Sequence, residues 1–191
     1  MSKIILASQS PRRKQLLEWA EIDFDIIVPS TDESYPGDTP IEKVATCIAR
    51  QKALAVQKDG RYQSLPTPLP ILAADTVVVC DNRIIGKPRD ESEAKATLSL
   101  LSGKKHEVIT GVSILTEDRE LSFEDRTEVW FYPLTPPQIE FYIKKYKPSD
   151  KAGAYAIQEW IGVVGIQRIN GDFYNVMGLP VSRVIRLLQE L

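Results

Sequence analysis

The segment Ile71–Val79 constrains the fold of this chain more than any other part of its sequence. Its apolar side chains follow one another without alternation, so both faces of the strand that it predicts must be buried. Strands of this kind are typical of sheets covered by helices on both faces. Asp75 and Thr76 interrupt the run, and a carboxylate buried there is costly unless it pairs with a cation or binds a metal. Asp75 is therefore either a functional residue or a structural one that forms an ion pair or caps the strand.

Predicted strands and helices alternate along most of the 191-residue chain, and two long strands meet in one hairpin. The patterns predict strands at residues 3–7, 24–28, 71–80, 84–85, 106–115 and 121–132, with short strands near 163–169. Helices are predicted to begin at residue 11 and to cover residues 40–58, 90–101, 135–146 and 181–191, with caps at Ser10, Thr39 and Thr135. Loops are predicted at residues 29–38 and 60–70. We expect an α/β fold with a mixed sheet, formed by one domain that spans residues 1–191.

Two lysines stand at positions where a charge needs an explanation. Lys52 falls on the apolar stripe of the helix predicted at residues 40–58, which favours a side chain that faces the core. Lys87 lies between Gly86 and Pro88, which fix the local backbone. Each is either a cation that binds an anionic ligand or an ordinary lysine that reaches the surface from the helix end or a loop.

The segment Ser8–Arg13 follows the first predicted strand and opens a helix. N–H groups at a helix N-terminus attract anions, whereas the cations of Arg12 and Arg13 are unfavourable there by themselves. Two arginines in this first turn are explained if a phosphate or carboxylate binds between them. The alternative is an exposed arginine pair with little effect on stability.

The acids Asp32 and Glu33 lie in the predicted loop and gain interest because either can join Asp75 around a cation. Their hard oxygen ligands suit Mg²⁺ or Mn²⁺, which bind phosphates directly. Arginines, isolated lysines and a buried acid together indicate phosphoryl or nucleotidyl chemistry. Neither GxxxxGK[ST] nor GxGxxG occurs, so a P-loop kinase and a dinucleotide oxidoreductase are unsupported.

The composition argues against several other classes of protein. The net charge is -2 without a sustained basic patch, which disfavours binding to nucleic acid. Cys47 and Cys80 lie in no CxxC motif and are expected to be reduced thiols, and no zinc site is expected because His106 is the sole histidine. No stretch resembles a secretion signal or a membrane span, so we expect a cytoplasmic protein without a membrane partner.

Eight segments, in order along nearly the whole chain, resemble the motifs of the Maf family of nucleotide pyrophosphatases. They are Leu6–Arg13, Asp32–Glu33, Gln51–Ala53, Ala74–Val78, Gly86–Pro88, His106–Val112, Asp150–Gln158 and Asn175–Pro180. The resemblance implies an α/β fold like that of inosine-triphosphate pyrophosphatases, with two lobes that flank a cleft. It also implies hydrolysis of a nucleoside triphosphate at the α-phosphorus, with release of pyrophosphate.

The resemblance assigns roles to residues that match the family motifs. Asp75 corresponds to the catalytic acid or base, and Glu33 joins it at a divalent metal, Mg²⁺ or Mn²⁺. The residues that hold the phosphates are Ser8, Arg12, Arg13, Lys52 and Lys87. A homodimer is expected on the same ground.

Arg13, Thr76 and Gln158 match positions typical of the branch that acts on dTTP and UTP. A glutamine amide offers a donor and an acceptor, so it can pair with a carbonyl and the N3–H of a pyrimidine. A sister branch that acts on 7-methyl-GTP differs around residue 158. The sequence departs from the family at Glu159–Trp160, where a glycine is usual, and at Met177, where a valine is common.

Other functions remain open at this point. The family is associated with arrest of cell division and septum formation, so a nucleotide-binding regulator is one alternative, as is a pyrophosphatase that prefers 7-methyl-GTP or purines. Asp75, Lys52 and Glu33 favour an enzyme, because a protein that only binds nucleotide needs no acid at a metal. His106 is expected to be a structural, hydrogen-bonded histidine.

Overall fold

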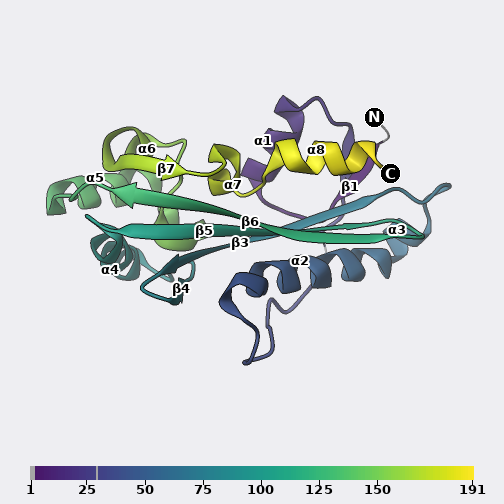
Figure 1. The fold of residues 1–191 in the computed structure, drawn as a ribbon, viewed down its shortest axis with the longest axis horizontal. Coiled ribbons are helices and arrows are strands. Elements are labelled where there is room, and N and C mark those ends of the chain that lie inside the picture. Colours follow the sequence, from purple (N-terminus) through teal and green to yellow (C-terminus); the bar gives the residue numbers. More distant parts are fainter. Residues whose placement is uncertain (1–2, 29) are drawn as a thin grey trace. The chain divides into compact units, whose positions relative to one another are not determined.

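The computed structural model describes residues 3–28 and 30–191, and its strands form one mixed sheet with the order β2-β1-β3-β5-β6-β7, in which β4 pairs with β3 (Figure 1). The strands are β1 (Ile4–Leu6), β2 (Phe24–Ile26), β3 (Ile71–Cys80), β4 (Arg83–Ile85), β5 (Lys105–Leu115), β6 (Glu120–Phe131) and β7 (Ile166–Asn170). The α/β fold with a mixed sheet is therefore confirmed.

The helices follow the predicted order with additions. They are α1 (Pro11–Trp19), α2 (Ile41–Gln57), α3 (Gly60–Gln63), α4 (Glu91–Leu101), α5 (Pro136–Tyr146), α6 (Trp160–Gly165), α7 (Phe173–Met177) and α8 (Val181–Gln189), with 3-10 turns at Pro148–Asp150 and Ala152–Ala154. Within the described ranges, no helix has the length and apolarity needed to span a bilayer.

Several local predictions were wrong. The helix cap predicted at Thr39, a capping box with Glu42, does not form, because Pro40 is the N-cap of α2 and no side chain caps that end. Residues 60–63, predicted as loop, form α3, whose N-cap Asp59 accepts a hydrogen bond from the Arg61 N–H at 2.9 Å. Residues 163–165, predicted as strand, belong to α6. Pro29, which begins the predicted loop 29–38, lies outside the described residues.

The chain divides into two compact units. Unit 1 contains Met1–Asp75, Thr110–Asp125 and Gly178–Leu191, and unit 2 contains Thr76–Ile109 and Arg126–Met177. The long strands β3, β5 and β6 each contribute residues to both units. Asp75 is the last residue of β3 in unit 1.

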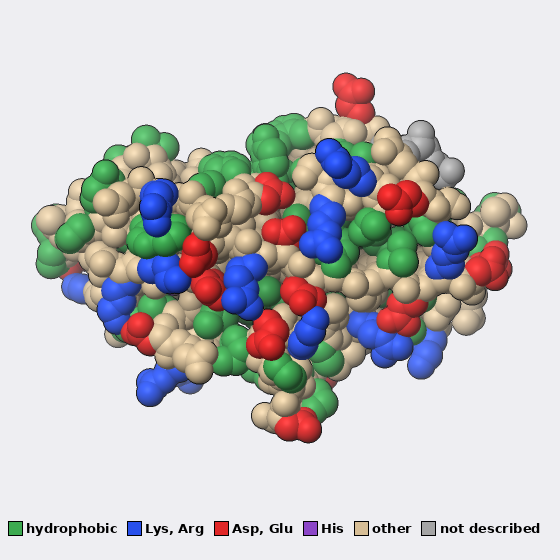
Figure 2. Space-filling model, viewed as in Figure 1, with side chains coloured by type: hydrophobic (Ala, Val, Ile, Leu, Met, Phe, Trp, Pro, Cys, Tyr) green, Lys and Arg blue, Asp and Glu red, His purple; other side chains and the backbone are tan. Residues whose placement is uncertain are grey.

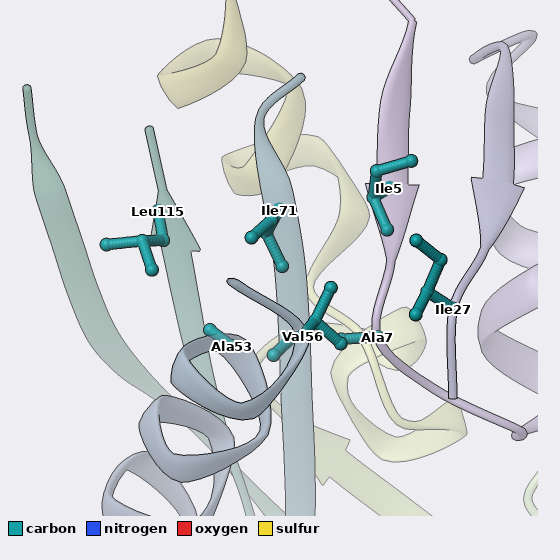
Figure 3. Packing of buried hydrophobic residues seen from close by; sticks show 8 residues of the cluster. Ile5, Ala7, Ile27, Ala53, Val56, Ile71 and Leu115 are labelled. Carbon is teal, nitrogen blue, oxygen red and sulfur yellow. The ribbon is translucent and has the colours of Figure 1, made fainter. Parts of the chain in front are cut away.

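Unit 1 is built on parallel strands. Ile5 of β1 pairs with Asp25 of β2 on one side and with Ile71 of β3 on the other. A cluster of buried side chains forms its core. They come from β1, β3, β5 and α2 and from the residues that directly follow β1 and β2: Ile5, Ala7, Ile27, Ala53, Val56, Ile71, Ala73 and Leu115 (Figure 3). Helix α2 covers one face of this part of the sheet, and α8 lies on the other (Figures 1 and 3).

Helix α2 and strand β5 approach each other closely at Gly111. A Cβ atom built on Gly111 would lie 2.1 Å from the backbone nitrogen of Thr46 and 2.2 Å from the carbonyl carbon of Ala45. No other residue type fits that space, so glycine sets the packing distance between α2 and the sheet. This contact fixes the helix that carries Lys52.

Unit 2 combines antiparallel strands with the helices α4 and α5, which pack on each other. Val78 of β3 pairs with Ile85 of β4, and β6 pairs with β7. Gly153 has a φ of 69° and lies next to Val78. A Cβ built on Gly153 would lie 2.9 Å from a methyl group of Val78. The motif around residue 153 is therefore held tightly against β3.

Charges of both signs intermingle on the face of the molecule shown in Figure 2. Ion pairs link neighbouring elements within each unit, such as Lys43 with Glu124 at 2.6 Å in unit 1 and Lys95 with Glu140 at 2.6 Å in unit 2. Exposed pairs of this kind contribute little to stability.

Candidate active site

Lys52 joins two of the three acids that the sequence singled out. Its Nζ lies 2.7 Å from Oδ1 of Asp75 and 2.7 Å from Oε1 of Glu33. The two carboxylate oxygens are thus no farther apart than twice that distance. The side chains of Lys52 and Asp75 are only 11% and 14% exposed, whereas that of Glu33 is 49% exposed. A lysine from α2, an acid from β3 and an acid from the loop 30–38 therefore form one cluster in unit 1.

The contacts in this cluster decide between the alternatives that the sequence left open for Asp75, for Lys52 and for the two loop acids. Asp75 lies in the middle of β3, so it does not cap a strand end. Its ion pair with Lys52 is the structural alternative that is observed, but a Lys52 that points inward rather than along the helix end is not an ordinary surface lysine. Of the two loop acids, Glu33 is the one that pairs with Lys52.

The chemistry of this donor set fits a divalent cation shared with a ligand. Among the residues described, no group of three His, Cys, Asp or Glu side chains could hold a metal by itself. Mg²⁺ is commonly bound by one or two carboxylates, with water and substrate phosphates in the remaining positions. Glu33 and Asp75 offer those two carboxylates, each with a second oxygen besides the one that contacts Lys52. The pair therefore suits an ion that arrives with a polyphosphate.

The turn after β1 holds Arg13 in a defined position. Arg13 is buried, its Nε donates to the carbonyl of Gly178 at 2.8 Å, and its guanidinium donates to Ser8 Oγ at 3.1 Å. Ser8 Oγ also accepts the N–H of Ser10, which is the predicted N-cap of α1. The alternative of an exposed arginine pair is thus excluded for Arg13, while Arg12 is partly exposed.

The surroundings of Arg13 tie this turn to the acid cluster. Burial lowers the pKa of Arg13, and the negative charges of Asp75 and Glu33 act in the opposite direction. The positive charge of Arg12 adds to the lowering. Ser8, Arg12, Arg13, Glu33, Lys52 and Asp75 all belong to unit 1. Cations from two elements and two acids thus interact within one unit.

The other three predicted site residues belong to unit 2. Thr76 follows Asp75 in β3 and is partly buried. Lys87 is exposed in the turn after β4, and Gly86 beside it accepts a hydrogen bond from the Gly153 N–H at 3.2 Å. A backbone hydrogen bond therefore holds the segment that contains Lys87 against the segment that leads to Gln158.

Gln158 is exposed and lines an open pocket of about 490 Å³ in unit 2. The pocket is mainly apolar and is lined by Ile157, Gln158, Gly162, Val163, Ile166, Gln167, Arg168, Ile169 and Phe173. An apolar pocket with a few polar groups is typical of small-molecule sites. Trp160 is not among its lining residues, and its ring packs on Phe141 at 4.8 Å between centroids.

His106 is the structural residue that the sequence predicted. It is 1% exposed, and its Nε2 lies 2.8 Å from the Tyr155 hydroxyl. Burial lowers the pKa of His106 to about 4, and burial likewise raises the pKa of Tyr155. Its Nδ1 makes no hydrogen bond within the described part of the chain. His106 is therefore neutral near pH 7.

Sequence reasoning missed two positioning features. Gly178, whose φ is 117°, supplies the carbonyl that holds Arg13, and its place in the Asn175–Pro180 motif was the available signal. Tyr142 hydrogen-bonds to Glu159 and to the backbone of Ala156, and no pattern in the sequence indicated that contact.

Comparison with known proteins gives the chain its family. The family model described as Maf-like protein matches residues 3–191. Three similar proteins are each named dTTP/UTP pyrophosphatase. That of Cytophaga hutchinsonii is 50% identical over 188 residues, which cover 98% of this chain and 84% of the relative.

The other two come from Bacillus mycoides, at 45% identity, and Bacillus cereus, at 47% identity. Each alignment spans 190 residues and covers 100% of this chain and 96% of the relative. The match of a family model over almost the whole chain, together with relatives at this identity, shows that the chain belongs to the Maf family.

Proposed function

We propose that this protein hydrolyses dTTP and UTP to the nucleoside monophosphate and pyrophosphate. The observation that carries the proposal is the cluster of Lys52, Glu33 and Asp75, which sets a buried acid beside a cation in the unit that also holds Arg13. The names of the relatives at 45–50% identity support the same reaction and the same bases.

The phosphates are the natural ligands of the cations in unit 1. Arg13 is held by Ser8 and Gly178, so its guanidinium is oriented before a ligand binds. Arginine binds phosphate oxygens through two parallel N–H donors, and Lys52 adds a point charge. In our proposal Ser8, Arg12, Arg13 and Lys52 bind the triphosphate and neutralise its charge. For Lys87, in unit 2, the role of a phosphate ligand rests on the family resemblance alone.

Asp75 has the chemistry of a proton acceptor for the attacking water. In the proposed reaction the water oxygen forms a bond to the α-phosphorus, and the bond from that phosphorus to the bridging oxygen of pyrophosphate breaks. The water proton passes to the Asp75 carboxylate, and pyrophosphate takes the negative charge of the leaving oxygen. A divalent cation held by Glu33 and Asp75 would supply charge neutralisation on the phosphate oxygens.

The base is the part of the substrate that Gln158 would recognise. Its amide can donate to a carbonyl of thymine or uracil and accept the N3–H, a pairing that cytosine does not offer. The apolar walls of the pocket that Gln158 lines, with the ring of Phe173 among them, suit the faces of a pyrimidine. Thr76 is proposed to contribute to the same selectivity.

Two experiments test the reaction. Hydrolysis of dTTP in water labelled with oxygen-18 should place the label in the monophosphate, because attack is at the α-phosphorus, and label in pyrophosphate would contradict this. Removal of divalent cations with a chelator should abolish turnover, and Mg²⁺ or Mn²⁺ should restore it. Turnover that survives complete chelation would contradict the role of Glu33 and Asp75 as metal ligands.

We further propose a cytoplasmic location, which the sequence pattern led us to expect, and a homodimer, which the family resemblance implies. Light scattering coupled to size-exclusion chromatography measures the mass in solution. A mass of twice the 21.5 kDa of one chain is expected, and a mass equal to one chain would contradict the dimer.

A further inference from the structure

The segment that carries Gln158 is a hydrogen-bonded turn. The N–H of Glu159 donates to the carbonyl of Ala156 at 3.1 Å, which leaves Ile157 and Gln158 as the two central residues. Ile157 is buried and Gln158 is exposed, so the turn anchors one side chain in unit 2 and presents the other. The position of the Gln158 amide therefore depends on how firmly this turn is held.

One hydroxyl group ties both ends of the turn together. Tyr142 of α5 is fully buried, and its hydroxyl accepts the N–H of Ala156 at 3.1 Å. The same hydroxyl donates to Oε2 of Glu159. Ala156 opens the turn and Glu159 closes it, so a single buried group holds both sides of Gln158.

The Glu159 carboxylate completes this clamp with its other oxygen. Oε1 lies 3.6 Å from Nζ of Lys151, a side chain that is 9% exposed and that also pairs with Asp150 at 2.7 Å. A second anchor lies next to the turn, where Tyr155 bonds to His106. Partly buried polar contacts of this kind fix one backbone geometry, because a broken contact leaves a buried group unpaired.

We propose that Glu159 is a positioning residue for base recognition, which acts through Tyr142 to fix the turn that presents Gln158. This inference rests on the proposed hydrolysis of dTTP and UTP. Glu159 touches neither the phosphates nor the reacting atoms in this account. It lowers the entropic cost of binding the base, because the Gln158 amide is already oriented when the nucleotide arrives.

The first test asks whether Glu159→Ala changes the KM and leaves kcat unchanged. We expect the KM for dTTP to rise about 10-fold and kcat to stay within about 2-fold, since the loss falls on ground-state binding. Preference for dTTP over CTP should fall about 10-fold, as expected when an oriented polar contact is lost. Glu159→Gln keeps an oxygen that accepts from Tyr142 and should recover most of the loss. Glu140→Gln, which alters an exposed ion pair on the same helix as Tyr142, is the matched control.

The second test asks whether Glu159 acts through Gln158. In a Gln158→Ala background, Glu159→Ala should change the dTTP-to-CTP preference by less than about 2-fold, because coupled residues do not add. Equal loss of kcat on every substrate, or full additivity with Gln158→Ala, would overturn the inference. Should Glu159→Ala fail to fold, Tyr142→Phe removes the hydroxyl and carries the same expectations. Wild-type protein that hydrolyses no pyrimidine triphosphate would instead overturn the proposed function, and this inference with it.

Discussion

Lys52 Nζ lies 2.7 Å from Asp75 Oδ1, so a lysine on the apolar stripe of α2 and an acid inside a buried strand neutralise each other. Each charge is costly alone, and together with Glu33 they form a cluster of two negative charges and one positive charge. Each of the two carboxylates keeps a second oxygen besides the one that contacts Lys52, and such oxygens suit a divalent cation.

Replacement of Lys52 by methionine should affect both stability and turnover. It removes the cation that both carboxylates contact, so we expect a loss of about 2 kcal/mol in the free energy of unfolding. The loss of a phosphate ligand should lower kcat/KM by about 100-fold. Urea unfolding and steady-state kinetics measure the two effects.

A control variant and a double variant test whether the lost ion pair causes these effects. Lys58→Met alters an exposed lysine at the end of the same helix and should change neither quantity. Lys52→Met combined with Asp75→Asn should be more stable than Lys52→Met alone, because the buried charge is then absent. A double variant less stable than either single variant would contradict the ion pair as the source of the effect.

Replacement of Arg13 by lysine should be far from conservative. Lysine cannot donate to Gly178 and Ser8 while it also presents a planar fork to phosphate. We expect the KM for dTTP to rise about 10-fold or more, with a measurable loss of stability. Lys14→Arg, at an exposed position of α1, is the control. Unchanged kinetics in Arg13→Lys would exclude Arg13 from the phosphate site.

His106 should make the fold sensitive to acid. Its pKa is about 4 in the folded protein, against about 6.5 in an unfolded chain. Between these values the unfolded state binds a proton that the folded state does not, so stability falls as the pH drops through this window. Below pH 4 the loss in the free energy of unfolding that is due to His106 is complete and amounts to about 3 kcal/mol.

The variant His106→Gln isolates this effect, because it lacks the titrating group and can still bond to Tyr155. Unfolding free energies measured in urea from about pH 7 to pH 4 should fall less steeply for the variant. Acidic residues titrate in both proteins, so their contribution cancels in the difference. Parallel pH profiles would show that His106 is not buried in its neutral form.

Substitution of Gly111 should disrupt unit 1. A Cβ would lie within 2.4 Å of backbone atoms of Thr46 and Ala45, and backbone cannot move aside as a flexible side chain can. Gly111→Ala should therefore cost about 4 kcal/mol or more, or yield insoluble protein. Gly60→Ala, where nothing lies within 4 Å, should keep wild-type stability. A Gly111→Ala protein with wild-type stability would contradict the close packing of α2 on β5.

The elements that the sequence predicted well are those with strong local signals. Strand β3 matches its predicted bounds because a two-sided apolar run has no competing pattern, and the turn at Asp81–Asn82 has positive φ at both residues. The capping box at Thr135 formed as predicted. At Thr39 the same motif failed, because the helix begins one residue later, after Pro40.

The residues of the candidate site also divide into those with a local signal in the sequence and those without one. Lys52 and Asp75 could be selected because a charge contradicts an apolar pattern, and the structure brings them together. Glu33 contradicts no pattern, and only the family resemblance selected it over Asp32. Gln158 entered through the family resemblance alone. The Tyr142–Glu159 contact joins α5 to a turn, and no local pattern records such a pairing between elements.

Pyrophosphate release from a panel of nucleotides tests the central claim most directly. The panel comprises dTTP, UTP, CTP, GTP, ITP and 7-methyl-GTP with Mg²⁺, for wild-type protein, Asp75→Asn and the exposed control Asp81→Asn. The account predicts that wild-type protein and Asp81→Asn prefer dTTP and UTP, and that Asp75→Asn loses about 1,000-fold or more in kcat while it still binds a non-hydrolysable α,β-imido analogue of dTTP. Turnover by Asp75→Asn at the wild-type rate, or a preference of the wild-type protein for a purine nucleotide, would contradict the account.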